Sequence, residues 1–169
     1  FFTSPNPPYG LKLSYYLKND KKSKYEKRIE TENYKFKKGE TIDYPTKKEL
    51  EGEAKEKSPK TLLTILSEDG KVIRRIPGKN KKGYHENYWD LRTFSYRNIE
   101  DEQDFSGALV PPGKYSVYLE EFENNIFKAL SEKFSFNVIP IASKSSKTER
   151  ESLFEFQIKF DKLFADVEK

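Results

Sequence analysis

The sequence predicts a mainly β fold: a β-sandwich of about seven strands with a short helical insertion and a C-terminal amphipathic helix. Three observations predict it. Short segments with alternating apolar and polar residues recur along the chain, separated by Gly, Pro, Asn and Asp at intervals typical of turns. Thirteen Phe and 11 Tyr supply ring area for a core, although the hydrophobic fraction is only 34%. The C-terminal segment instead has apolar residues at helical steps of three and four.

Length and charge limit the number of domains and the classes of partner. At 169 residues we expect one β-sandwich domain over 1–140, with an insertion at 19–58, and a helical tail over 141–169 truncated from a longer helical region. The 32 basic and 28 acidic residues are interleaved, so no basic stripe for nucleic acid is present. No apolar run approaches the ~20 residues that span a bilayer. We therefore expect neither nucleic-acid binding nor membrane insertion.

The cysteine and histidine content excludes several chemistries. The chain has no Cys, which removes disulfides, thiolate catalysis and the usual zinc frameworks. His85 is the single imidazole, and we expect it at the surface or at a strand edge. We predict no cofactor and no metal site. Because the chain opens at Phe1 and lacks Met, we expect it to be a module of a longer protein.

The first strands are predicted from period-two alternation. Residues 1–10, with three prolines, form an extended segment that cannot be helical. Leu11–Leu17 alternates apolar and polar side chains and is the first strand. Thr61–Ile76 is predicted to form a hairpin around the turn Glu68–Gly70. Tyr84–Arg92, which contains Trp89, is the next strand.

The second half of the predicted sandwich is organised around two turns. A long polar loop over 93–108 leads to the turn Pro111–Gly113. Lys114–Glu121 then alternates Tyr, Val and Leu with polar residues, as expected of a half-buried strand. After the turn Asn124–Asn125, Phe127–Ile139 is predicted to return as the next strand. This arrangement is typical of an immunoglobulin/fibronectin-like sandwich.

The insertion is predicted to be partly helical. The stretch Tyr25–Phe36 suits either a helix or an ordered loop. Lys47–Lys57 is rich in helix formers, and Thr46 precedes Glu49 by three residues, the spacing of a capping box. A short surface helix is therefore expected there.

The tail predicts an amphipathic helix over Glu149–Lys169, with Ser146 or Thr148 as its N-cap. A face this apolar must be covered by the sandwich or by a second helix, and we expect that helix beyond Lys169. Packing within the protein is the favoured interpretation, and helix-mediated self-association is the alternative. The stripe consists of Leu153, Phe156, Phe160, Leu163 and Val167, joined by Phe164.

Several local motifs occur together and in a fixed order. They are Asn6–Gly10, Leu13–Leu17, Asp43–Thr46, Asp69–Arg75, Trp89–Arg92 and Pro112–Val117. In this combination the chain resembles the C-terminal fibronectin/FlgD-like module of large secreted bacterial proteins described as sortilin-like or BNR-repeat glycosyl hydrolases. The likeness covers nearly the whole chain, including Phe156–Gln157. Two turns depart slightly from the family: Pro111–Gly113 replaces its commoner Leu-Pro-Gly, and Leu66–Gly70 is a variant.

The resemblance implies an accessory role rather than an enzyme. In such proteins the module packs against upstream β-propellers, which this chain lacks together with their Asp-box repeats, and any glycosidase activity would belong to those propellers. The implied location is extracytoplasmic: secreted, periplasmic or at the cell surface. Our first hypothesis is therefore a non-catalytic structural or interaction module with a protein ligand. Carbohydrate binding is the alternative, and an autonomous hydrolase is the third hypothesis.

Trp89, Asp90, Arg92 and Tyr118 are the candidate ligand-binding residues. Trp89 could stack on a sugar while Asp90 and Arg92 anchor it. The structural interpretation instead places Trp89 in the core, with Asp90 and Arg92 tying the strand end to a loop. Adjacent tyrosines, such as Tyr15 and Tyr16, must point to opposite faces of their strand, so outward ones could line a binding surface. Tyr115 and Tyr118 likewise belong to opposite faces.

The positions of the Asp and Glu residues in the sequence do not indicate an active site. Glycoside hydrolysis requires two facing carboxylates, one with a raised pKa. Glu120, Glu121 and Glu123 are the best local cluster, but we expect them to be solvated near a hairpin end. An oxygen-rich loop could hold calcium, but its spacing matches no recognised calcium loop. Its residues are Asp101, Glu102 and Asp104.

Overall fold

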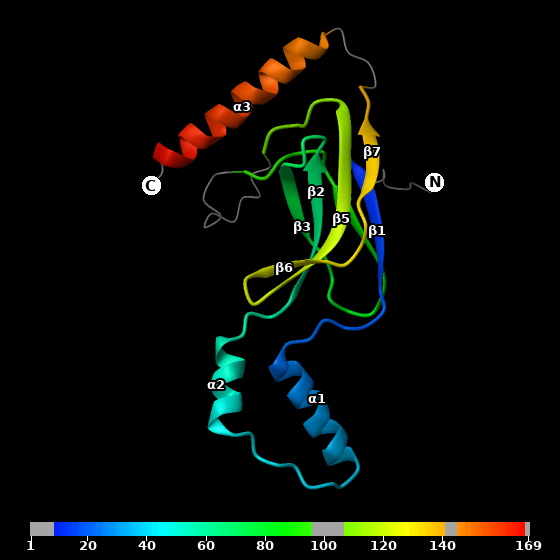
Figure 1. Cartoon of the computed structure of the whole chain (residues 1–169), viewed down its shortest axis with the longest axis vertical. Helices are drawn as coiled ribbons and strands as arrows, with labels where there is room; N and C mark the ends of the chain where they lie inside the picture. Colours follow the sequence, from blue (N-terminus) through cyan, green and yellow to red (C-terminus); the bar gives the residue numbers. More distant parts are fainter. Residues whose placement is uncertain (1–8, 96–106, 141–144, 168–169) are drawn as a thin grey trace, which may run out of the picture.

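The computed structural model describes residues 9–95, 107–140 and 145–167, which form two β-sheets and three helices (Figure 1). The predicted β-rich fold with helices is confirmed. The elements in chain order are β1 (Leu11–Leu17), α1 (Lys24–Lys37), α2 (Lys47–Lys55), β2 (Lys60–Ser67), β3 (Val72–Pro77), β4 (Gly83–Trp89), β5 (Gly113–Glu123), β6 (Ile126–Ala129), β7 (Phe134–Val138) and α3 (Lys147–Val167).

The strands pair antiparallel in both sheets. β1 and β4 form a two-stranded sheet in which Leu11 lies opposite Trp89 and Leu17 lies opposite Gly83. The second sheet has the order β3-β2-β5, and β6 and β7 share the remaining edge of β5. We call the strands of both sheets together the β body. None of the three helices among the described residues is long and apolar enough to cross a bilayer.

The predicted single return strand Phe127–Ile139 is wrong, because the chain makes two short strands there. β6 pairs with Glu120–Glu123, and β7 pairs with Gly113–Val117. Between them the backbone N–H of Leu119 donates to Oγ of Ser131 at 2.9 Å instead of to a backbone carbonyl. The N–H groups of Leu130 and Ser131 both donate to the carbonyl of Leu119, at 2.8 and 3.3 Å. The extra residues thus interrupt the ladder, as in a β-bulge.

Side chains from both sheets meet in one hydrophobic cluster. β1 contributes Leu13, Tyr15 and Leu17, and β4 contributes Trp89. From the other sheet come Leu63, Ile65, Tyr115, Val117 and Leu119. Ile65 and Trp89 have no exposed surface. The period-two pattern of β1 and β5 therefore marks core residues, as the sequence predicts.

The insertion forms two helices at one end of the β body, opposite the end crossed by α3 (Figure 1). Both begin with a capping box: Ser23 with Glu26 in α1, and Thr46 with Glu49 in α2. The capping prediction for α2 is confirmed, and the stretch left as helix or ordered loop is the helix α1. Neither helix contains a buried residue.

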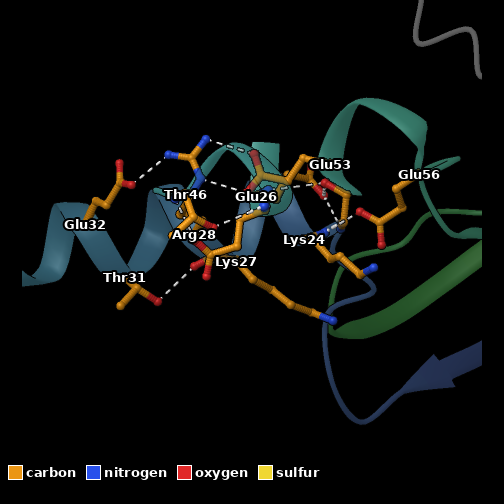
Figure 2. A network of polar contacts seen from close by, with 11 residues as sticks. Lys24, Glu26, Lys27, Arg28, Thr31, Glu32, Thr46, Glu53 and Glu56 are labelled. Carbon is orange, nitrogen blue, oxygen red and sulfur yellow. Dashed lines mark hydrogen bonds and ion pairs between the residues drawn. The ribbon is translucent and has the colours of Figure 1, made fainter. Parts of the chain in front are cut away.

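Charged side chains join α1 to α2. Figure 2 shows Arg28 of α1 lying between Glu32 and Glu53. Its Nε and Nη2 donate to the two carboxylate oxygens of Glu53 at 2.7 and 2.9 Å, and its Nη1 donates to Glu32 at 2.6 Å. The backbone N–H of Lys24 donates to Glu56 at 2.6 Å. We refer to α1 and α2 as the helix pair.

The C-terminal helix is confirmed, but it turns a different face toward the β body from the one expected. Ser146 is its cap, since its backbone N–H donates to Glu149 at 2.7 Å and its Oγ accepts from the N–H of Glu149 at 3.2 Å. Phe154 packs against the core cluster, and Asp161 and Ala165 are buried. Phe156, Phe160, Leu163 and Val167 of the predicted stripe are instead 52–78% exposed, so the expected packing of the stripe as a whole against the β body is wrong.

Candidate functional site

The Trp89–Arg92 motif forms a closed corner of the β body. Trp89 is the last residue of β4, and its ring meets the rings of Tyr115 and Phe136 edge-on, with centroids 5.9 and 6.0 Å apart. Its indole N–H donates to the carbonyl of Arg92 at 2.8 Å. A ring with no exposed surface cannot stack on a sugar, so the geometry favours the structural interpretation of Trp89.

Asp90 and Arg92 have local partners in the same corner. The carboxylate of Asp90 accepts from Nη1 of Arg74 at 3.1 and 3.2 Å and from the N–H of Arg92 at 3.1 Å. Arg92 donates through Nη1 to the carbonyl of Gly107 at 3.1 Å. Leu91 between them has a φ of 60°, which ends the strand earlier than predicted. These contacts tie the strand end to a loop.

Tyr118 lies on the other face of the five-stranded sheet. Its neighbours Val117 and Leu119 belong to the core cluster, so Tyr118 projects away from Trp89. Its hydroxyl donates to Glu120 at 2.8 Å. Burial raises the pKa of Tyr118, and the adjacent Glu120 carboxylate raises it further. The four predicted ligand-binding residues therefore do not converge on one site.

Glu120 is buried, which corrects the expectation that it is solvated. Only 2% of the residue is exposed, and its carboxylate accepts from Oγ1 of Thr64, from Nε of Arg75 at 2.9 Å and from Tyr118. The guanidinium of Arg75 also lies 4.4 Å from the centroid of the Phe127 ring, on this same face. The alternation of residues along one strand does not reveal which side chains of neighbouring strands cover Glu120.

The electrostatics of Glu120 suit a structural anion. Burial raises its pKa, but the hydrogen bonds from Thr64, Arg75 and Tyr118 and the charge of Arg75 more than offset this, and the net pKa is lowered. A general acid for glycoside hydrolysis needs a raised pKa. Glu120 thus remains ionised at neutral pH and cannot take that role.

The other acidic and imidazole candidates also lack a catalytic arrangement. Glu121 follows Glu120 in β5, so it points to the opposite face, where its carboxylate pairs with Nζ of Lys21 at 3.0 Å. Nε2 of His85 lies 2.5 Å from the carbonyl of Lys81. Within the described residues, no group of three or more His, Asp or Glu could hold a metal ion. Asp101, Glu102 and Asp104 lie outside the described residues.

Tyrosines cover the outer face of the two-stranded sheet. Tyr16 lies directly opposite Tyr84, and both are about three-fifths exposed, while Tyr88 is 40% exposed. The hydroxyl of Tyr84 donates to Glu86 at 2.7 Å and lies 2.9 Å from Oγ of Ser14. Tyr15 and Tyr115 are buried, so the expected division of adjacent tyrosines between two faces is confirmed. We call Tyr16, Tyr84 and Tyr88 the tyrosine face.

The tyrosine face and α3 hold the exposed candidates: the sequence predicts outward tyrosines such as Tyr16 and, as an alternative, the stripe of α3, and its motifs miss Tyr84 and Tyr88. The alternation of Tyr84, Glu86 and Tyr88 in Gly83–Trp89 is a usable sequence signal for an exposed face. On α3, the stripe of Leu153, Phe156, Phe160, Leu163 and Val167 is 52–78% exposed. We call these five residues the apolar stripe. Five large apolar side chains in a row constitute an exposed patch of the kind that marks interaction surfaces.

Comparisons with known proteins returned no match: no family model, no curated protein and no solved structure corresponds to this chain. The functional assignment therefore depends on the surfaces themselves.

Proposed function

We propose that this chain is a non-catalytic interaction module that self-associates through the apolar stripe of α3. The exposure of that stripe is the observation that carries the proposal. The candidate polar residues also support the proposal, because Asp90, Arg92 and Glu120 all make contacts within the chain. Such contacts stabilise the fold, and these three side chains do not line a shared pocket.

The stripe is available because α3 uses a separate face to contact the β body. Phe154 packs against the core cluster from that face, and the buried Asp161, which accepts from Oγ of Ser95 at 3.3 Å, follows Phe154 by two helical turns. Steps of three and four residues place the stripe in the a and d positions of a heptad pattern. Within it the rings of Phe156 and Phe160 stack, with centroids 6.3 Å apart. One face of α3 therefore contacts the β body, and the apolar stripe on another face is available to a partner.

A second copy of the chain is the partner that we propose. With their observed exposures, the five side chains of the stripe offer roughly 600 Å² of apolar surface on each chain. Two chains related by a two-fold axis would bury about 1,200 Å² in total, the lower end of the range for specific interfaces. An a/d seam is self-complementary, as a two-fold interface requires.

Sedimentation velocity over a range of concentrations tests this proposal. We expect a concentration-dependent dimer that Phe160→Lys abolishes, since it places a charge at the centre of the stripe. Glu155→Lys is the matched control, because it adds the same side chain to an exposed position of α3 off the stripe. A wild-type chain that stays monomeric at its highest attainable concentration would falsify self-association. The partner of the stripe would then be a different protein.

The finer fold and the cellular context belong to the same proposal. We infer that the two sheets face each other as an immunoglobulin/fibronectin-like sandwich; the shared core cluster and the contact of Trp89 with Tyr115 and Phe136 support this. The family resemblance supports an extracytoplasmic setting beside upstream β-propellers. The gene sequence upstream of this segment tests the context: a leader peptide and propeller repeats are expected, and a continuous cytoplasmic enzyme domain there would contradict it.

Carbohydrate binding remains the second candidate function because of the tyrosine face. Tyr16 and Tyr84 form an exposed aromatic pair beside Ser14 and Glu86, which could orient sugar hydroxyls. Affinity electrophoresis in immobilised glycans tests it. Binding that Tyr16→Ala weakens and Tyr44→Ala leaves unchanged would support this function. Tyr44 is an exposed tyrosine that lies outside both strands of the two-stranded sheet. Equal mobility with and without glycan would exclude it.

A further inference from the structure

A groove separates the first turns of α3 from the end of the β body. Its volume is about 720 Å³, within the range of small-molecule sites. Leu91, Val138 and Ile139 line it from the body side, and Leu153 and Phe154 line it from α3. Figure 1 shows α3 running across this end of the body. Most of the wall is therefore hydrocarbon.

Arg150 is the charged side chain among the described residues of the groove wall. Its Nη1 donates to the carbonyl of Ser145, while its Nε is buried and has no hydrogen-bond partner. Among the described residues no carboxylate lies within ion-pair distance of Arg150, although its charge contributes to lowering the pKa of the adjacent Glu149. A buried Nε–H of a half-buried guanidinium is unusual without an acceptor, because desolvating a charged donor is costly unless it is paired. An anionic ligand would supply the missing acceptor.

We propose that this groove binds a medium-chain alkyl carboxylate, that is, a fatty acid. The carboxylate accepts a charge-assisted hydrogen bond from Nε of Arg150, and the alkyl chain lies between Phe154 and the Val138–Ile139 segment. An apolar wall with one half-buried cation complements this chemistry, whereas a sugar would leave its hydroxyls facing Leu and Pro side chains. Arg150 is not part of the apolar stripe, and Leu153 is the residue that the groove and the stripe share, so the two proposals are separated by experiment.

Octanoate and 1-octanol are suitable probes because they share a chain and differ in the head group. We expect saturable one-to-one calorimetric binding of octanoate to the full chain, with 1-octanol bound about tenfold more weakly because it carries no charge for Arg150. Arg150→Gln is expected to weaken octanoate by a similar factor and to leave 1-octanol unchanged. Lys147→Gln, at an exposed lysine of the same helix that does not line the groove, is the matched control.

The comparison of the two probes on the wild-type chain keeps the proposal falsifiable even if Arg150→Gln does not fold. Equal affinity for octanoate and 1-octanol, or no saturable binding of either, would overturn it. The titration is repeated with Phe160→Lys, which disrupts the proposed dimer. Octanoate binding retained in that variant separates this site from self-association, whereas binding lost with the dimer would show that the site requires a second copy and contradict the proposal for the single chain.

Discussion

The β body and the helix pair are stabilised by different forces. In the body, nine buried strand residues and Val110, just before β5, form one apolar cluster, and Ile65 and Trp89 are completely enclosed. The helix pair has no buried residue in either helix and is joined by ion pairs around Arg28. Buried apolar area stabilises strongly, whereas ion pairs that solvent still reaches, such as these partly exposed ones, contribute about 0–1 kcal/mol each. Two parts of one chain should therefore open at very different free energies.

The two ends of the insertion, unlike its helices, are held to the β body by hydrogen bonds and an ion pair. The N–H of Lys21 donates to the carbonyl of Asn80 at 2.7 Å, and Lys21 pairs with Glu121. The side chain of Asn80 accepts from the N–H of Thr61 at 2.9 Å and donates to the carbonyl of Pro59 at 2.6 Å. Both ends of the insertion are thus anchored to strands. We expect the helix pair to open locally from a fixed base.

The largest effect is expected from Trp89→Leu, which should destabilise the whole body. The substitution removes two ring contacts and leaves the carbonyl of Arg92 without its indole donor. We expect a loss of about 3–5 kcal/mol in the free energy of unfolding, measured by urea titration. Tyr44→Leu, at a side chain that is 89% exposed, is the control. A loss below about 1 kcal/mol would place Trp89 outside the core.

Glu120→Gln should have an intermediate effect that depends on pH. It keeps the shape of the side chain but removes the charge that Arg75 and Tyr118 contact, so we expect a loss of about 1–3 kcal/mol at pH 7. The folded pKa of Glu120 is lowered, so its contribution is complete above the unfolded value of about 4.3 and is lost as the pH falls through the folded pKa.

The difference in stability between wild type and Glu120→Gln should therefore shrink as the pH falls below about 4. Urea titrations at several pH values measure it. A difference that stays constant down to pH 2 would mean that the carboxylate charge adds nothing, and that packing alone explains the variant.

Ser23→Ala should affect the helix pair alone. Ser23 caps α1 by accepting from the N–H of Glu26 at 3.2 Å, and loss of an N-cap typically costs about 1 kcal/mol. Hydrogen exchange of the first amides of α1 is expected to accelerate, while the urea midpoint of the body changes little. Thr31→Ala, at an exposed position of the same helix, provides the control. Equal acceleration in β2 would show that the two regions unfold together.

The smallest effect on global stability is expected from Arg28→Gln. Arg28 holds α2 through Glu53, and this contact lowers the pKa of Glu53. The pairing is therefore present above the unfolded pKa of Glu53 and is lost as the pH falls through its lowered folded value. We expect faster hydrogen exchange in α2 and an unchanged urea midpoint. Lys37→Gln serves as the control on the same helix. A lower midpoint in Arg28→Gln alone would contradict independent opening.

Local sequence signals predicted the strands and caps well because their causes are local. Alternation marked Leu11–Leu17 as a strand, and Thr46 with Glu49 marked the start of α2. The division of Phe127–Ile139 into two strands was missed, since it depends on Ser131 substituting for a backbone partner of Leu119 in a distant strand. The burial of Glu120 was missed for a similar reason: Thr64 and Arg75 come from two other strands.

By itself, the sequence determined that this protein is rich in strands, that its tail is an amphipathic helix, and that cysteine chemistry is absent, because periodicity and composition are properties of neighbouring residues. Only the tertiary structure decided which face of α3 contacts the body. The apolar stripe and the face with Phe154 and Ala165 are both compatible with helical spacing. Packing selects between them through the shape of the β body, which the helix sequence does not encode.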